Sequence, residues 1–223
     1  MERSVRDEIL AKLKAAPKAA VPPRPPLPPY ATLSMGKEEL IKEFSQRLAD
    51  ETVVVHRVKD FEEARAKLAV VAVEEGLKKV MATTDDVVSR LDLPSWGKEH
   101  GVQVMTPKDF PDRYAYRDAI FDQVQAGITG ADFGIAESAT IAIAHNKDQA
   151  RLVSLAPILH IAIVPVDRIV PVYEQAIEKF FSKKGQYPSQ FVFISGPSQT
   201  GDIQGVLFKG MHGPRKVIVI LVG

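Results

Sequence analysis

The chain has 223 residues, with 29 Lys and Arg against 28 Asp and Glu, and 45% of its residues are hydrophobic. The balanced charge argues against nucleic acid or an anionic membrane as the main partner, because both select for an excess of basic residues. The chain has no cysteine, which excludes disulfides, thiolate nucleophiles and Cys-ligated zinc or iron–sulfur sites within it. It shows no signal-peptide pattern and no apolar run near the ~18–20 residues of a membrane span, so we expect a cytoplasmic protein without membrane insertion.

The first 32 residues differ in composition from the rest. Val5, Ile9 and Leu13 are spaced as on one helix face, which predicts a helix over residues 1–16. The proline-rich run at 21–29 predicts an extended polyproline II segment. We interpret this run as a stiff arm, although it formally contains the P-x-x-P pattern of SH3 ligands. A short helix cannot bury an apolar stripe by itself, so we expect it to dock on the body or on a second subunit of a homo-oligomer.

From residue 33 onward, strands and helices alternate. The patterns predict helices near 40–48, 60–76, 116–124 and 173–181, and strands at 52–56, 79–82, 102–105, 158–164, 191–194 and 217–222. Residues 127–130 and 138–144 are either two strands or one long strand bent at its glycines. Several strands are apolar on both faces, which is typical of a mostly parallel sheet covered on both sides. The expected fold is therefore a three-layer α/β/α arrangement.

The segment with the strongest functional pattern is a turn that follows the apolar strand 191–194. Its candidate ligand-binding residues are Ser195, Gly196, Ser198, Thr200 and Asp202. Hydroxyls combined with a carboxylate suit a sugar diol, a hydroxy acid or a hydrated Mg²⁺ better than a pure phosphate site. A second turn contains His212 between glycines and before a proline, which favours an exposed acid or base.

A second candidate segment follows the strand at 79–82. Thr83 and Thr84 begin the next element, where they either cap a helix or present hydroxyls to a ligand. The two interpretations are compatible, because the carboxyl ends of parallel strands meet at one edge of a sheet.

Two charged residues and one histidine complete the candidates. In strand register Glu137 shares a face with Ile135 and Ile141, where a buried carboxylate would have a raised pKa suited to a base or nucleophile. The alternative is that Glu137 lies just before the strand, at the pocket. Arg151 is either a fork for a small carboxylate or a surface residue near a helix start. His160 lies within an apolar strand and is interpreted as a core histidine.

Taken in order, these motifs resemble the LUD-domain family. The resemblance rests on Gly134–Thr140, Arg151 to Leu155, His160–Ile161, Ser195–Ile203 and Gly210–Pro214, and covers roughly residues 35–223. It divides the chain into an arm at 1–32 and a LUD domain at 33–223. The sequence departs from the family pattern at Ala139, where glycine is usual, and at Gln204, where glutamate is common.

The resemblance implies a fold like that of ribose-5-phosphate isomerase and the CoA-transferases. It also implies a component of an L-lactate utilisation system that supports oxidation of L-lactate to pyruvate with iron–sulfur partner proteins. Under this hypothesis Arg151 holds a carboxylate, Ser198, Thr200 and Asp202 bind hydroxyls or a cofactor, and His212 accepts a proton.

Two alternatives remain open. One is an independent enzyme of the cyclo-ligase or transferase type that binds a nucleotide, folate or CoA ester, with Glu137 as nucleophile. The other is a non-catalytic assembly subunit that uses the N-terminal helix. We assign no metal-ligating set. The cofactor is left unknown, since neither a G-x-G-x-x-G nor a Walker A pattern occurs. The ligand is expected to be a small carboxylate or a nucleotide-like molecule.

Overall fold

A computed structural model describes residues 5–17, 34–182, 188, 190–201 and 207–223. The chain divides into two units, residues 1–30 and 31–223. The first contains α1 (Val5–Ala15), whose apolar stripe of Val5, Ile9 and Leu13 is exposed. The second contains every other element that is described.

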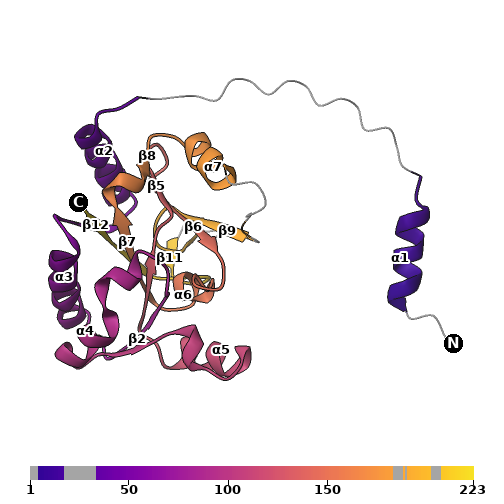
Figure 1. The fold of residues 1–223 in the computed structure, drawn as a ribbon, viewed down its shortest axis with the longest axis horizontal. Helices are drawn as coiled ribbons and strands as arrows, with labels where there is room; N and C mark the ends of the chain where they lie inside the picture. The colour runs from indigo at the N-terminus through magenta and orange to yellow at the C-terminus, as the bar shows by residue number, and fades with distance from the viewer. Residues whose placement is uncertain (1–4, 18–33, 183–187, 189, 202–206) are drawn as a thin grey trace. The chain divides into compact units, whose positions relative to one another are not determined.

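The centre of the second unit is a six-stranded sheet that is parallel throughout (Figure 1). Its strands lie in the order β1 (Val54–Val58), β12 (Lys216–Val222), β7 (Leu159–Pro165), β4 (Ala126–Gly130), β2 (Lys79–Ala82) and β3 (Gln103–Met105). Every neighbouring pair is parallel, which confirms the expected mostly parallel sheet. The middle strands are fully buried, as their continuous apolar sequences predict.

Alternation along the strands builds a separate core on each face of the sheet. Ile161 and Ile163 of β7 join one cluster, and Ala162 and Val164 join another. The first face is covered by α3 (Phe61–Glu74), the 3-10 turn η1 (Val88–Leu91) and α4 (Leu93–His100). The second is covered by α2 (Lys37–Asp50), α5 (Arg113–Asp122) and α6 (Leu152–Leu155). Helices on both sides confirm the three-layer expectation.

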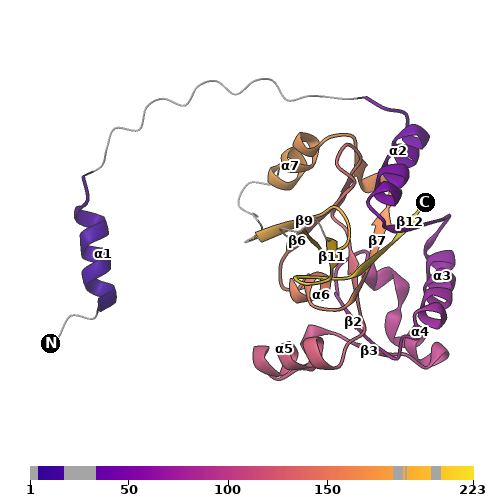
Figure 2. The same ribbon diagram turned by 180° about the vertical axis from the view of Figure 1, so that it is seen from behind.

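A smaller sheet adds to the second face. Its order is β8 (Ile169–Val170), β5 (Phe133–Ile135), β6 (Thr140–His145) and β9 (Gln190–Ile194). Helix α7 (Tyr173–Phe181) lies against it, as the two opposite views show (Figures 1 and 2). Phe133 and Phe180 meet edge to face with ring centroids 4.8 Å apart. Strands β10 (Gln199–Gly201) and β11 (Leu207–Lys209) form a separate antiparallel pair. Two further 3-10 turns are η2 (Pro107–Asp109) and η3 (Val166–Arg168).

Two sequence expectations need correction. The strand expected at 52–56 is β1 at Val54–Val58, because Thr52 is left-handed (φ 64°) and Val53 N–H bonds back to Leu48, which closes α2. The region 127–144 holds three strands, because the segment expected to separate two strands contains β5. Glu137 therefore lies in the turn from β5 to β6 and is exposed, instead of sharing a buried face with the isoleucines.

Candidate functional site

The carboxyl edge of the central sheet contains a topological switch point. From β2 the chain proceeds to β3 on one side, and it then returns to β4 on the other side of β2. The connections that leave β2 and β4 therefore diverge, and this opens a crevice where α/β sheets commonly bind ligands. Residues 83–86 follow β2, and residues 131 and 132 follow β4, so both segments border this crevice.

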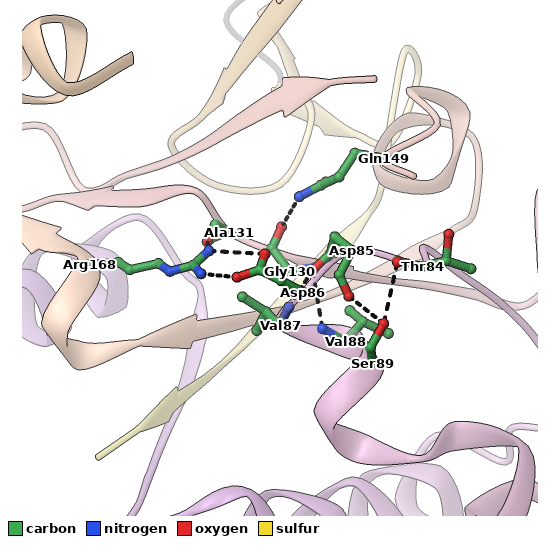
Figure 3. Close-up of polar contacts among 10 residues, drawn as sticks. All are labelled: Thr84, Asp85, Asp86, Val87, Val88, Ser89, Gly130, Ala131, Gln149 and Arg168. Atoms are coloured by element: carbon green, nitrogen blue, oxygen red, sulfur yellow. Dashed lines mark hydrogen bonds and ion pairs between the residues drawn. The ribbon is translucent and has the colours of Figure 1, made fainter. Parts of the chain in front are cut away.

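Asp85 organises the loop after β2 (Figure 3). One carboxylate oxygen accepts the backbone N–H groups of Val87 and Val88 at 2.9 and 3.1 Å, which caps η1. The other accepts the Thr83 hydroxyl at 2.5 Å and the Gly130 N–H at 3.2 Å. Asp85 therefore ties the ends of β2 and β4 together, and its four bonds give it a structural role.

Arg168 reaches the same edge from η3, after β7. It donates to the carbonyl of Ala131 at 3.2 Å and forms an ion pair with Asp86. Figure 3 shows its guanidinium group pointing toward Asp86 and Ala131. Ala131 and Asp86 are thus held by a cation that comes from a distant part of the sequence.

The loop after β6 closes the other side of this crevice. Thr84 N–H donates to the Asp148 carbonyl at 2.9 Å, and Lys108 Nζ lies 2.8 Å from the Asp148 carboxylate. The Gln149 side-chain amide donates to the Gly130 carbonyl at 3.2 Å. The oxygen of the same side-chain amide, Gln149 Oε1, is buried and has no partner among the described residues.

Asp132 is the carboxyl group at this edge with a shifted pKa near neutrality. Burial raises its pKa to about 6, against the opposing effects of the Ala144 N–H, which donates to it at 2.6 Å, and of Arg168. A carboxyl group with this pKa takes up and releases a proton near neutral pH, which suits acid–base chemistry.

Two cavities flank the 83–86 segment. The larger, which we call the β2–β3 cavity, has a volume of about 500 Å³ and is lined by Ala82, Thr83, Thr84, Val88, Ser89, Asp92, Leu93, Pro94, Val104, Thr106 and Asp109. The smaller, of about 250 Å³, is lined by Asp85, Asp86, Asp132, Asn146, Lys147, Asp148 and Gln149. The first is mixed apolar and hydroxylic, and the second is polar.

The structure gathers the C-terminal motif residues around a different part of the sheet. Ser198 N–H donates to the Pro214 carbonyl at 2.8 Å, and His212 N–H lies 3.4 Å from the Ser198 hydroxyl. His212 lines a cavity of about 350 Å³ with Phe121, Leu152, Leu155, Ala156, Gly210, Met211 and Gly213. Thr200 is paired with Phe208 in the β10–β11 ladder. Asp202 lies outside the described residues.

Ser195 and Gly196 lie near the end of α2. The Ser195 hydroxyl is 2.7 Å from that of Thr140, at the start of β6. Gly196 adopts a positive φ of 144°, and a β-carbon there would be 3.1 Å from the Glu51 carbonyl. The backbone geometry of this turn therefore requires glycine.

Glu137 and Arg151 each have a local partner. Glu137 Oε1 accepts the Tyr173 N–H at 2.7 Å, at the first residue of α7, and lines a cavity of about 190 Å³ with Arg47 and Glu51. Arg151 is exposed at the start of α6 and donates to the Gln190 side chain at 2.7 Å. Both are accessible to solvent.

Two sets of candidate residues therefore lie at opposite edges of the sheet. Thr83 and Thr84 follow the carboxyl end of β2. The Ser198–His212 set lies beside residues 214 and 215, which precede the amino end of β12. A strand of seven residues separates the two edges by roughly 20 Å, so one small ligand does not contact both sets.

A model of the LUD domain matches residues 41–222 of this chain. The chain belongs to the LUD-domain family. A relative named lactate utilization protein C from Anoxybacillus flavithermus is 32% identical over 72% of this chain and 70% of the relative. A relative of the same name from Bacillus subtilis is 35% identical over 56% of this chain and 58% of the relative. Another from Deinococcus radiodurans is 28% identical over 88% of this chain and 86% of the relative.

One solved structure has a similar fold. A crystal structure of a DUF162 family protein from Deinococcus radiodurans is similar, with a TM-score of 0.63 and 22% identity, over 85% of this chain and all of that one. Among the residues that the structure describes, no helix of this LUD protein is long and apolar enough to cross a membrane.

The sequence patterns did not identify three residues at the carboxyl edge of the central sheet. Asp132 and Gln149 lie in the loops after β4 and β6, and Arg168 lies in η3, after β7. The signal for Arg168 and Asp132 was their place just beyond an apolar strand, which is the same signal that identified Thr83. Gln149 carried no signal, because its importance depends on a loop that folds back on Gly130.

Proposed function

We propose that this chain is a component of an L-lactate utilisation system, and that it supports oxidation of L-lactate to pyruvate together with iron–sulfur partner subunits. The observation that carries the proposal is membership of the LUD-domain family, with relatives named lactate utilization protein C at up to 38% identity among those compared. The 32% match that spans 72% of this chain supports a shared role.

The proposal assigns electron transfer to the partner chains. Conversion of L-lactate to pyruvate releases two electrons and two protons. The sequence has no cysteine, so thiolate-held clusters that accept these electrons belong to other subunits. This chain would then contribute ligand binding, proton handling or assembly.

Within this proposal, the region around His212 handles the substrate. His212 lines a cavity whose other lining is largely apolar and glycine-rich, and its N–H lies 3.4 Å from the Ser198 hydroxyl. A neutral imidazole there can accept the proton of a hydroxy acid. Arg151 is exposed, and the hydrogen-bond partner of its side chain among the described residues is the uncharged Gln190, so its guanidinium is available to a carboxylate. Glu137, Ser195, Gly196, Thr200 and Asp202 stay candidates for the surrounding ligand contacts.

Growth of an in-frame deletion on L-lactate or pyruvate tests the proposal. We expect growth on pyruvate but not on L-lactate, with recovery by the wild-type gene. Complementation with His212→Ala tests the site, and His100→Ala is the matched control, because His100 is exposed on α4. Equal growth of the deletion strain on both carbon sources, with no second lactate enzyme present, would contradict a role in lactate utilisation.

The switch-point crevice favours a second candidate function, an independent enzyme of the cyclo-ligase or transferase type. The smaller cavity, which is lined by Asp85, Asp86 and Asp132, borders this crevice, where open α/β sheets bind nucleotide-like ligands. We expect a CoA ester, an adenine nucleotide or a folate to raise the melting temperature of the full chain if this candidate is correct. No shift with any of the three would eliminate it.

A further inference from the structure

The β2–β3 cavity has a chemical character that differs from that of a lactate site. At about 500 Å³ it is within the usual range for small-molecule pockets. Its walls combine apolar side chains, from Ala82, Val88, Leu93, Pro94 and Val104, with four hydroxyl groups and two carboxylates. No lysine, arginine or histidine is among the lining residues.

The four hydroxyl groups already donate their hydrogens within the protein. Thr83 donates to the Asp85 carboxylate at 2.5 Å, and Ser89 donates to the Asp85 carbonyl at 2.6 Å. The Thr106 hydroxyl donates to Asp109 at 3.0 Å, and the Thr84 hydroxyl lies 3.3 Å from Asp148 Oδ1. A hydroxyl has one hydrogen and two lone pairs. Because the hydrogen is already used, each hydroxyl can only accept a hydrogen bond from a ligand.

The carboxylates add further acceptors. One carboxylate oxygen of Asp109 accepts the Thr106 N–H and hydroxyl, which leaves its second oxygen without a donor among the described residues. Asp92 is exposed at the start of α4, with its carboxylate 3.9 Å from Arg65. Pro94 in the first turn of α4 has no N–H, so this helix end presents fewer donors than usual.

The basic side chains beside this lining are engaged elsewhere. Arg65 donates to the Leu91 and Asp92 carbonyls at 2.6 and 2.9 Å and pairs with Glu99. Lys108 pairs with Asp148 at 2.8 Å. A carboxylate or phosphate in the cavity would thus meet negative charge and lone pairs, without a cation among the lining side chains to compensate.

We propose that the β2–β3 cavity binds an amino-substituted heteroaromatic ring that is uncharged or cationic, and that it excludes carboxylates and phosphates. The ring packs between Val88, Leu93 and Val104, and its N–H groups donate to the Thr and Ser hydroxyls and to Asp109. This ligand class follows from the lining of the cavity and is independent of the lactate role, because L-lactate is an anion with a single hydroxyl donor.

Methyl NMR on the full chain tests the proposal with four probes: adenine, purine, L-lactate and inorganic phosphate. The reporters are the methyl groups of Val88, Leu93 and Val104. We expect adenine to shift these signals and the two anions to leave them unchanged. Purine has the same ring without the amino group, so it should bind about five-fold or more weakly, the ordinary contribution of one hydrogen bond.

Two pairs of variants locate the binding. Val104→Phe fills the cavity and should weaken adenine binding at least about ten-fold, through steric exclusion. Val73→Phe makes the same change at an exposed position on α3 and should bind adenine as the wild type does. Ser89→Ala removes one acceptor and should weaken adenine binding about five-fold, and Ser95→Ala on the exposed side of α4 should not. This second pair carries the test if Val104→Phe does not fold.

Three results would overturn the proposal. One is a methyl response to L-lactate or phosphate that equals or exceeds the response to adenine. Another is adenine binding that neither Val104→Phe nor Ser89→Ala weakens. The third is no response to adenine up to its solubility limit. Because the growth test on L-lactate is scored separately, failure here leaves the proposed lactate role standing, and the reverse also holds.

Discussion

His160 should make the stability of this protein depend on pH. It is fully buried in β7, and its Nε2 lies 2.8 Å from the Thr129 hydroxyl on the neighbouring strand. Its other ring nitrogen, Nδ1, has no partner among the described residues. Burial lowers the pKa of His160 to about 4, because the charged ring cannot be hydrated there.

The direction and size of the effect follow from proton linkage. Between pH 6.5 and 4 the unfolded chain binds a proton at this histidine and the folded chain does not, so the free energy of unfolding falls as the pH is lowered. With pKa values of about 4 folded and about 6.5 unfolded, His160 should cost roughly 2 kcal/mol of stability between pH 7 and pH 5.

Asp132 acts in the opposite direction over the same interval. Its pKa is raised to about 6 in the folded state, so the folded chain takes up a proton that the unfolded chain does not. This gain should offset about 1 kcal/mol of the loss on acidification from pH 7 to pH 5. Burial also lowers the pKa values of His56 and His145, which adds to the loss.

Urea unfolding at pH 7 and pH 5 isolates the histidine when the wild type is compared with Thr129→Val/His160→Leu. The double variant replaces both polar partners with apolar groups, which is close to neutral at pH 7. It should lose about 2 kcal/mol less than the wild type at pH 5. The Thr129→Val single variant is the control, because it keeps the histidine and should keep the pH dependence. Parallel losses in the wild type and the double variant would refute the reasoning.

Three further predictions concern backbone geometry and capping. Thr52→Gly should raise the unfolding free energy by about 0.5–1 kcal/mol, because a β-branched residue is unfavourable at φ 64°. Thermal unfolding measures this, and an unchanged melting temperature would show that Thr52 is not strained. Gly127→Ala should cost at least about 2 kcal/mol, because a β-carbon there would be 1.8 Å from a backbone oxygen, whereas Gly36→Ala, with open space around it, should be tolerated. Glu137→Ala should lower the unfolding free energy by about 1 kcal/mol, because the hydrogen bond from the Tyr173 N–H is lost. Glu137→Gln keeps an acceptor oxygen and should retain most of the stability. Equal losses of stability in the two variants would argue against this capping role.

The local elements of this protein were predictable because their signals are local. A helix was expected near 60–76, and the Asp60 carboxylate accepts the Glu63 N–H at 2.8 Å at the start of α3. The apolar run at 158–164 predicted a buried strand, and β7 is buried on both faces. Periodicity and capping act over a few residues, so they can be recognised without knowledge of the rest of the chain.

The sequence by itself therefore determined the alternation of strands and helices, the parallel sheet and the family motifs. The tertiary structure alone decided which candidate residues share a site. The parallel direction of the strands places Thr83 and His212 at opposite edges of the sheet, and the strand order brings Arg168 to Asp86 across 82 positions of sequence. Strand order is set by pairings between distant segments, and no local pattern of charge or hydrophobicity encodes which strand becomes the neighbour of which.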